Sequence, residues 1–503
     1  MRLDDVPDLS TPRLIKLLSI FTDLAFEYKS IDGLEKSIIF LNSILKKDLN
    51  DSERSDICYL LSNAYCWTNR FKNSSLNDVW RWDNSEYENV IFFLRKATHR
   101  HLARRYDAIR LMQINTNLGN SMSCVGRFVE ALEYWDTALE IDPNFPMANG
   151  NKGECYFVYG NHLYDDGHRA YFYKEAYKYL QSSLKFRLFD EDRLHFIGIV
   201  DKIKKSINVN GIPDLKLKHF SLGNDGEEQL YRKWCLKNKL FLNPLNDLCV
   251  YDICARDIFH CASVAAPIDQ GPYHFGLYNQ LKQEFVSARF LLYEGMTSYD
   301  KHYSDREVML YNTLDYPLYS LGLEKIKCAY RMSYSIFDKI AYFIYKYYNI
   351  DVDERKVSLR TIWYDIKKKK REFRKQFKNM RNLPWRGLYW LSKDLYENNK
   401  MFQEVIEPDA REINEVRNQI EHKYLKIHEM LINMSEREEH KDIFKDRWAY
   451  SIKNEDIISK TKKILKLARA ALIYLSLGVR IEEMKRDDRR NNVVGSGALP
   501  LME

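Results

Sequence analysis

The sequence contains little glycine and proline, with 19 glycines and 12 prolines among 503 residues. Both residues mark turns and interrupt helices, so their scarcity argues against a fold built from many short strands and turns. Long stretches with apolar residues at three- and four-residue spacing lie between them. We therefore predict an all-α protein, and the length allows about three domains.

The nine cysteines are scattered along the chain, and no two of them form a C-x-x-C pair. An odd number without paired spacing argues against both a disulfide framework and a zinc ribbon. The sequence also shows no P-loop, no G-x-S-x-G turn and no paired-carboxylate metal site. We therefore expect no metal, no cofactor and reduced thiols.

Long hydrophobic runs are missing as well. The longest apolar segment, Ala470 to Val479, is far shorter than the ~20 residues that span a bilayer, and the N-terminus has no apolar signal segment. We expect a cytoplasmic protein without a membrane partner. The formal net charge of +7 permits an anionic partner without requiring one.

An internal repeat is present between residues 10 and 205. The following residues fall at the offsets of a tetratricopeptide repeat: Leu118, Gly119, Gly126, Phe128, Ala131, Trp135, Ala138 and Pro143. Small residues let paired helices approach, and proline ends a helix. The region 1–207 thus resembles a TPR array, which implies a groove for a peptide or protein partner. An array that only holds the next domain is the alternative.

A polar, glycine-containing connection follows the repeat region, and we interpret residues 208–275 as a connecting subdomain. A helical bundle is expected over 276–486. Its helices are predicted at 278–297, 321–349, 387–398, 409–434 and 455–486. The tail, residues 487–503, has no core-forming pattern, and we expect it to be mobile.

A basic run lies between the second and third of these helices. Its cations that could contact RNA phosphates are Lys367, Lys368, Lys369, Lys370, Arg371, Arg374 and Lys375. Such density gives salt-dependent binding to nucleic acid. A solvated helix face without a ligand is the alternative.

The sequence RNQIEHKY, residues 417–424, carries the candidate catalytic residues Arg417 and His422. Arginine offers a permanent cation with planar donors for a phosphate, and histidine exchanges protons near neutral pH. The apolar periodicity of 409–434 places His422 nearly opposite the buried stripe, and Tyr424 on it. An exposed histidine, with Arg417 in an ion pair with Glu421, is the alternative.

The spacing of these two residues has a geometric consequence. Five residues of helix separate them by ~7.5 Å along the axis and ~140° around it, so one helix cannot easily direct both at one phosphate. Two copies facing each other across a two-fold axis can. We therefore expect a homodimer if the motif is catalytic.

Three segments of the C-terminal half together resemble the HEPN superfamily: FDKIA at 337–341, LYWLSKDL at 388–395 and RNQIEHKY at 417–424. More narrowly, they are similar to HEPN domains fused to TPR repeats in bacterial proteins. The resemblance implies a helical bundle that dimerises and a metal-independent endoribonuclease of toxin or phage-defence type. Arg417 and His422 correspond to the functional pair. Asn418, Tyr424 and Asp338 are expected to support them, although Tyr424 could be core and Asp338 part of an ion pair at the bundle edge.

We hypothesise RNA cleavage by attack of a 2′-hydroxyl on the adjacent phosphate, with His422 moving the proton and Arg417 stabilising the phosphorane. Two alternatives remain open. One is a non-catalytic TPR scaffold with a dimerising or nucleotide-binding bundle, and the other is RNA binding without cleavage.

Overall fold

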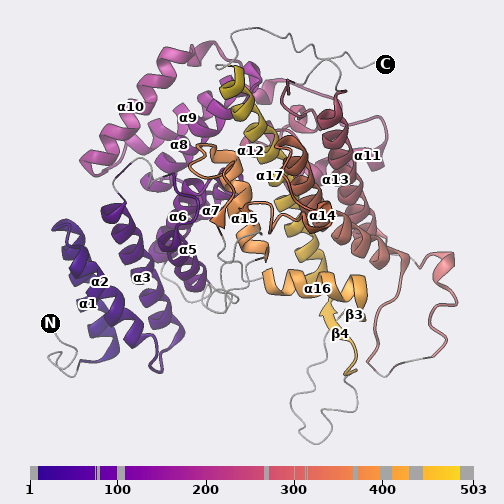
Figure 1. The fold of residues 1–503 in the computed structure, drawn as a ribbon, viewed down its shortest axis with the longest axis horizontal. Coiled ribbons are helices and arrows are strands. Elements are labelled where there is room, and N and C mark those ends of the chain that lie inside the picture. The colour runs from indigo at the N-terminus through magenta and orange to yellow at the C-terminus, as the bar shows by residue number, and fades with distance from the viewer. Residues whose placement is uncertain are drawn as a thin grey trace, which may run out of the picture. The chain divides into compact units, whose positions relative to one another are not determined.

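The computed structural model describes residues 9–73, 75, 80–98, 108–265, 271–298, 301–311, 313, 315–365, 372–396, 410–429 and 446–487. The chain divides into two compact units (Figure 1). Unit 1 contains Met1–Ile212 and Lys375–Pro408, and unit 2 contains Pro213–Arg374 and Asp409–Glu503. The fold is all-α, as the sequence predicts, with two short two-stranded sheets in unit 2.

Unit 1 is a series of helices. They are α1 (Thr11–Glu27), α2 (Ile31–Ile44), α3 (Asp51–Lys72), α5 (Ser85–Ala97), α6 (Ala108–Cys124), α7 (Phe128–Ile141), α8 (Pro146–His162), α9 (Asp166–Leu184) and α10 (Asp190–Ser206). Polar residues accept hydrogen bonds from backbone N–H groups at the start of several helices. At α3 the Asn50 side chain accepts from the backbone of Glu53, whose own side chain accepts from the Asn50 backbone, so two N–H groups without helical partners are satisfied.

Glycines set the spacing between successive helices of unit 1. A Cβ at Gly119 on α6 would lie 2.6 Å from the Trp135 ring on α7, and a Cβ at Gly160 on α8 would lie 3.0 Å from the Tyr173 ring on α9. Trp135 is buried, and its indole nitrogen donates to Asn120 Oδ1 at 3.1 Å. These positions therefore need glycine because large side chains occupy the space beside them.

A helix from the C-terminal half also belongs to unit 1. We expected the segment 387–398 in the C-terminal bundle, but α15 (Leu383–Tyr396) packs in unit 1 instead. Its Asp394 is buried between two equally buried arginines, Arg95 and Arg127, and Arg95 Nη2 lies 2.9 Å from Asp394 Oδ2. Local periodicity could not assign a partner to this carboxylate, which pairs with two buried arginines in unit 1.

A close backbone contact accompanies this buried charge cluster. A Cβ on Gly387 would lie 2.3 Å from the Gly126 carbonyl oxygen, and Gly126 itself has a φ of +90°. Two glycines therefore allow the turn between α6 and α7 to lie directly against α15.

Unit 2 contains α11 (Gly226–Lys237), α12 (Leu245–Leu248), α13 (Tyr273–Thr297), α14 (Leu321–Tyr347), α16 (Ala410–His422) and α17 (Asn454–Asp487). The predicted helices at 278–297, 321–349 and 455–486 correspond to α13, α14 and α17. Strands β1 (Tyr364–Asp365) and β2 (Glu372–Phe373) form an antiparallel pair with Tyr364 opposite Phe373.

Buried arginines fasten the segment before α13 to the bundle helices. Arg289 on α13 donates to both carboxylate oxygens of Asp257, at 2.9 and 2.7 Å. Arg469 on α17 binds Asp247 at 2.7 Å and donates to the Phe241 carbonyl at 2.6 Å. Each buried cation is paired with a carboxylate, which offsets the cost of removing it from water.

The helix that carries the RNQIEHKY motif is shorter than predicted. We expected it to continue to residue 434, but α16 ends at His422, and β3 (Leu425–His428) pairs in parallel with β4 (Tyr450–Lys453). Leu425 lies opposite Tyr450 and His428 opposite Lys453. The partner strand lies more than twenty residues away in sequence, so the helical spacing of Tyr424, Ile427 and Leu431 could not reveal it.

No helix in the part of the chain that the structure describes is both long enough and apolar enough to cross a membrane.

Candidate functional site

The motif helix α16 packs against α14 and α17 within unit 2. Ile413 and Val416 are fully buried, and the Tyr330 hydroxyl on α14 donates to the Ile413 carbonyl at 2.6 Å. Lys460 on α17 forms an ion pair with Glu412. Apolar burial and these two polar contacts fix the helix, which is drawn in orange beside β3 and β4 in Figure 1.

Arg417 lies on the side of α16 that faces α14. Its guanidinium carbon is 4.8 Å from the centroid of the Tyr334 ring. A cation over an aromatic face is held electrostatically while the edges of the guanidinium keep their donors. The side chain is half-buried, so part of it remains accessible.

Asp338 lies one helical turn beyond Tyr334 on α14 and is also half-buried. Burial raises the pKa of this carboxyl above its ordinary value, whereas the Leu359 backbone N–H and the positive charge of Arg417 act in the opposite direction. The structure thus brings Asp338 and Arg417 close enough for their charges to interact.

Tyr334 is the residue in this group that the sequence analysis missed. Tyr330, Tyr334 and Asp338 recur every four residues on α14, which places them along one face of that helix. Tyr330 and Tyr334 contact α16. This polar i, i+4 row inside an apolar helix was a readable signal for a face that meets the motif helix.

His422 is exposed at the last residue of α16, as its position opposite the apolar stripe predicts. Asn418 is half-buried one turn earlier. Among the described residues no ion pair joins Arg417 to Glu421, and the neighbouring polar contact is from Gln419 Nε2 to Glu415 Oε1 at 2.7 Å. Within one chain, Arg417 and His422 therefore occupy different environments: a helix-facing position and the open end of the helix.

Tyr424 lies beyond the helix, at the start of the strand pair. We expected the buried stripe to include it, but its side chain is 38% exposed, because the chain leaves the helix at Lys423. Its carbonyl accepts from the Tyr450 N–H at 2.9 Å, and its hydroxyl forms a hydrogen bond with Tyr319. Burial, and then that bond, raises the pKa of Tyr319 to about 12.

A buried lysine follows on β3. Lys426 is 2% exposed, and its Nζ lies 2.6 Å from Asp315 Oδ2 and 2.9 Å from Asp446 Oδ2. Burial alone would lower the pKa of Lys426, but the two carboxylates outweigh it and raise that pKa above its ordinary value. The backbone of this segment is also tied, because the Leu318 N–H donates to the Ile427 carbonyl at 2.7 Å. Sequence reasoning missed this cluster because its members lie far apart in the chain.

Most of the basic run lies outside the described residues, namely Lys367, Lys368, Lys369, Lys370 and Arg371. The two described cations differ. Arg374 is buried and donates through Nε to the Ile362 carbonyl at 2.9 Å, and burial lowers its pKa. Lys375 is exposed.

A cluster of three or more histidine, cysteine, aspartate or glutamate side chains that could hold a metal ion is not found among the described residues.

The C-terminal half of the chain is similar to a known domain family. Residues 266–482 match the family model of LA2681-like HEPN domains. This match contains α13, α14, α15, α16 and most of α17, and it supports the HEPN part of the resemblance seen in the sequence. No curated protein matches the chain.

Proposed function

We propose that the chain is a metal-independent endoribonuclease of toxin or defence type, with Arg417 and His422 as its catalytic pair. The observation that carries the proposal is the position of these residues within the HEPN match, with Arg417 braced by Tyr334 and His422 open to solvent. An exposed imidazole can reach an RNA backbone, and a braced guanidinium can receive a phosphate.

In the proposed reaction a ribose 2′-hydroxyl attacks the adjacent phosphorus, and the bond to the 5′-oxygen breaks. His422 takes the hydroxyl proton as the general base, and the His422 of a second copy gives a proton to the leaving oxygen. Arg417 stabilises the added negative charge of the phosphorane. The products are a 2′,3′-cyclic phosphate and a 5′-hydroxyl, and DNA is spared because it lacks the attacking group.

The rest of the chain has assigned roles in this proposal. The basic run, including the exposed Lys375, contacts RNA phosphates in a salt-dependent way. The helices of unit 1 form a TPR-like array, which the close glycine contacts at Gly119 and Gly160 support, and this array senses a peptide or protein. The bundle of unit 2 forms the homodimer in a cytoplasmic setting.

The decisive experiment is the substitution His422→Ala. We expect RNA cleavage by the purified chain to fall by at least roughly a hundredfold, since general acid–base catalysis contributes ~10²–10⁴-fold. Product ends are identified by their 2′,3′-cyclic phosphates, and a chelator should leave the rate unchanged. The matched control is His195→Ala, an exposed histidine of unit 1 that pairs with Glu154. Equal cleavage by both variants and the wild type would exclude the proposal.

One observation favours a non-catalytic alternative. Arg417 already has a ring and a nearby carboxyl as neighbours, which suits a structural role at the contact of α14 and α16. In that case the bundle is a dimerisation or nucleotide-binding module, and unit 1 is a scaffold. Absence of cleavage by wild-type protein, with host growth unaffected by its expression, supports this alternative.

A further inference from the structure

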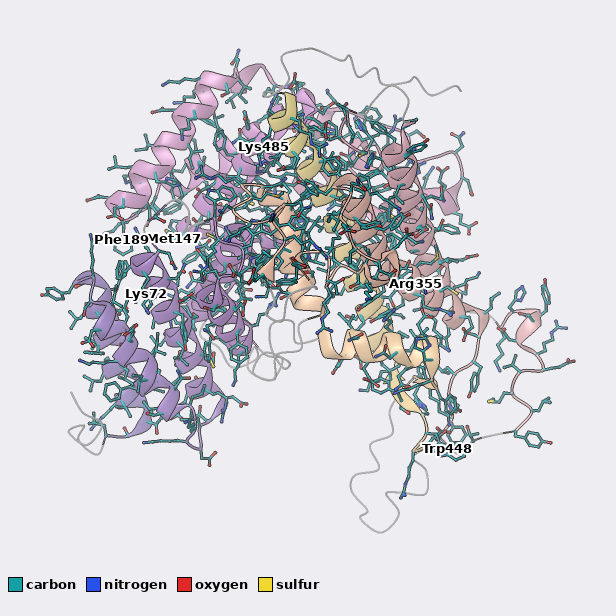
Figure 2. The ribbon with its side chains drawn as sticks, viewed as in Figure 1. Lys72, Met147, Phe189, Arg355, Trp448 and Lys485 are labelled. Atoms are coloured by element: carbon teal, nitrogen blue, oxygen red, sulfur yellow. The ribbon has the colours of Figure 1, made fainter. Side chains whose placement is uncertain are left out.

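The strand pair that follows His422 displays exposed aromatic side chains. Tyr424 is 38% exposed, Tyr319 is 37% exposed and Trp448 is 89% exposed. Figure 2 shows Trp448 at the end of the strand pair that lies away from α17. A tryptophan exposed to this degree contributes nothing to the core, so its ring is available to a ligand.

These three rings come from segments that backbone bonds hold together. The Tyr450 N–H, two residues after Trp448, donates to the Tyr424 carbonyl at 2.9 Å. On the other side of β3, Tyr319 and Tyr424 share a hydrogen bond, and the neighbouring Leu318 is bonded to Ile427. The segments that carry these rings therefore meet at the start of β3, and Tyr424 lies two residues from His422.

Ion pairs of a buried lysine hold these three segments together. Lys426 on β3 binds Asp315 in the segment leading to Tyr319 and Asp446 in the segment leading to Trp448. Asp446 also accepts from the Trp448 N–H at 2.9 Å. One lysine thus joins all three ring-bearing segments, and it neutralises the carboxylates closest to them.

Exposed cations directly precede two of the rings, and the exposed carboxylate Glu421 lies three residues before Tyr424. Lys423 and Arg447 are exposed, and each directly precedes a ring, Tyr424 and Trp448 respectively. Cations alternating with rings are what a single nucleic-acid strand requires, since phosphates meet the cations and bases stack on the rings. A duplex keeps its bases inside its own stack and cannot use the rings in this way.

We propose that Tyr319, Tyr424 and Trp448 form a stacking platform for unpaired nucleotides of RNA, which sets the substrate of the neighbouring His422 as single-stranded RNA. The inference rests on the proposed ribonuclease function and adds the residues that select the substrate.

The test measures RNA affinity in the His422→Ala background, where RNA stays intact. Fluorescence anisotropy compares a labelled single-stranded oligonucleotide with the same strand in a duplex. We expect Trp448→Ala to weaken binding of the single strand roughly tenfold and to leave duplex binding unchanged. Trp448→Phe should retain most of the affinity. The control Tyr273→Ala removes a ring that is 72% exposed at the start of α13. It should change neither the affinity for the single strand nor that for the duplex.

The outcomes separate this inference from the function on which it rests. Unchanged single-strand affinity in Trp448→Ala, or an equal loss for single strand and duplex, overturns the platform. A lower sedimentation coefficient in Trp448→Ala with unaltered RNA affinity also overturns it and identifies the surface as a contact between copies. Catalysis is judged independently, by comparing cleavage in the wild type and in His422→Ala.

Discussion

At the residue scale, the motif places two side chains of the same helix in contrasting surroundings. Arg417 lies against Tyr334, which restricts the guanidinium before any substrate arrives, whereas His422 is exposed. In the proposed reaction this contact would fix the position of the cation in advance. Asp338 adds a nearby carboxyl whose raised pKa reflects burial more than the pull of Arg417.

Lys426 is the residue whose removal should loosen the strand pair most. Lys426→Met leaves Asp315 and Asp446 without their buried cation, and we expect the local opening free energy of β3 to fall by about 2–3 kcal/mol. Hydrogen exchange of the amides of residues 425–428 measures the change. The control is Lys423→Met, which removes an exposed lysine three residues earlier.

The difference in hydrogen exchange between wild type and Lys426→Met should depend on pH. Burial raises the pKa of Asp315, but the hydrogen bonds from Lys426 and Thr313 and the charge of Lys426 together hold it below its ordinary value of 3.8. The stabilising contribution of Asp315 is therefore present above that value. The contribution is lost as the pH falls through the lowered pKa. The difference in protection between wild type and Lys426→Met should therefore shrink as the pH falls below about 5. A constant difference would contradict the charge pairing.

At the element scale, α15 shows how one buried carboxylate assigns a helix to a domain. The helix has the apolar spacing expected of a bundle member, yet Asp394 pairs with Arg95 and Arg127 in unit 1. The glycines at 126 and 387 allow the backbone approach that this pairing needs. The end of α16 is a second example, because strand pairing with 450–453 replaces the helical turns expected after His422.

Asp394→Asn tests the first of these arrangements. It removes the buried carboxylate shared by Arg95 and Arg127, while Arg127 keeps its ion pair with Glu130, and we expect unit 1 to lose about 3–5 kcal/mol of unfolding free energy. Urea unfolding followed by circular dichroism, together with exchange of the α15 amides, measures the loss. Asp32→Asn is the matched control, because Asp32 pairs with Lys36 on the surface at 2.6 Å and should cost less than about 0.5 kcal/mol. Similar losses in the two variants would show that the buried cluster is not stabilising.

At the scale of the whole molecule, the chain passes from one unit to the other and back. Residues 375–408 belong to unit 1, and the segments before and after them belong to unit 2. The HEPN match at 266–482 therefore spans parts of both units. This interleaving means that α15 of unit 1 is covalently followed, after residues 397–409, by the helix that carries Arg417 and His422.

Dimerisation is the prediction that belongs to this scale. If one copy's His422 acts as base and the other's as acid, an excess of His422→Ala protein should suppress cleavage by wild-type chains, because mixed dimers lack one histidine. An equal excess of the active Tyr273→Ala variant should not suppress it. Sedimentation velocity establishes that mixed dimers form. Unchanged wild-type activity in such mixed dimers would show that each chain acts alone.

Several features followed from the sequence by local rules. Apolar periodicity and the scarcity of glycine and proline determined the all-α class and the extents of α13, α14 and α17. The same periodicity placed His422 on the exposed side of its helix. The small residues of the repeat indicated close helix packing, and in the structure Gly119 lies against the Trp135 ring.

Tertiary structure alone decided the remaining features, because each depends on a partner distant in the chain. The strand at 425–428 exists because residues 450–453 pair with it, the location of α15 follows from Arg95 and Arg127, and the bracing of Arg417 comes from α14. The local spacing of apolar residues shows which side chains of a segment can be buried together. It does not show which charged residue or strand from a distant part of the sequence will contact that segment. Such long-range contacts form the surroundings of the candidate site.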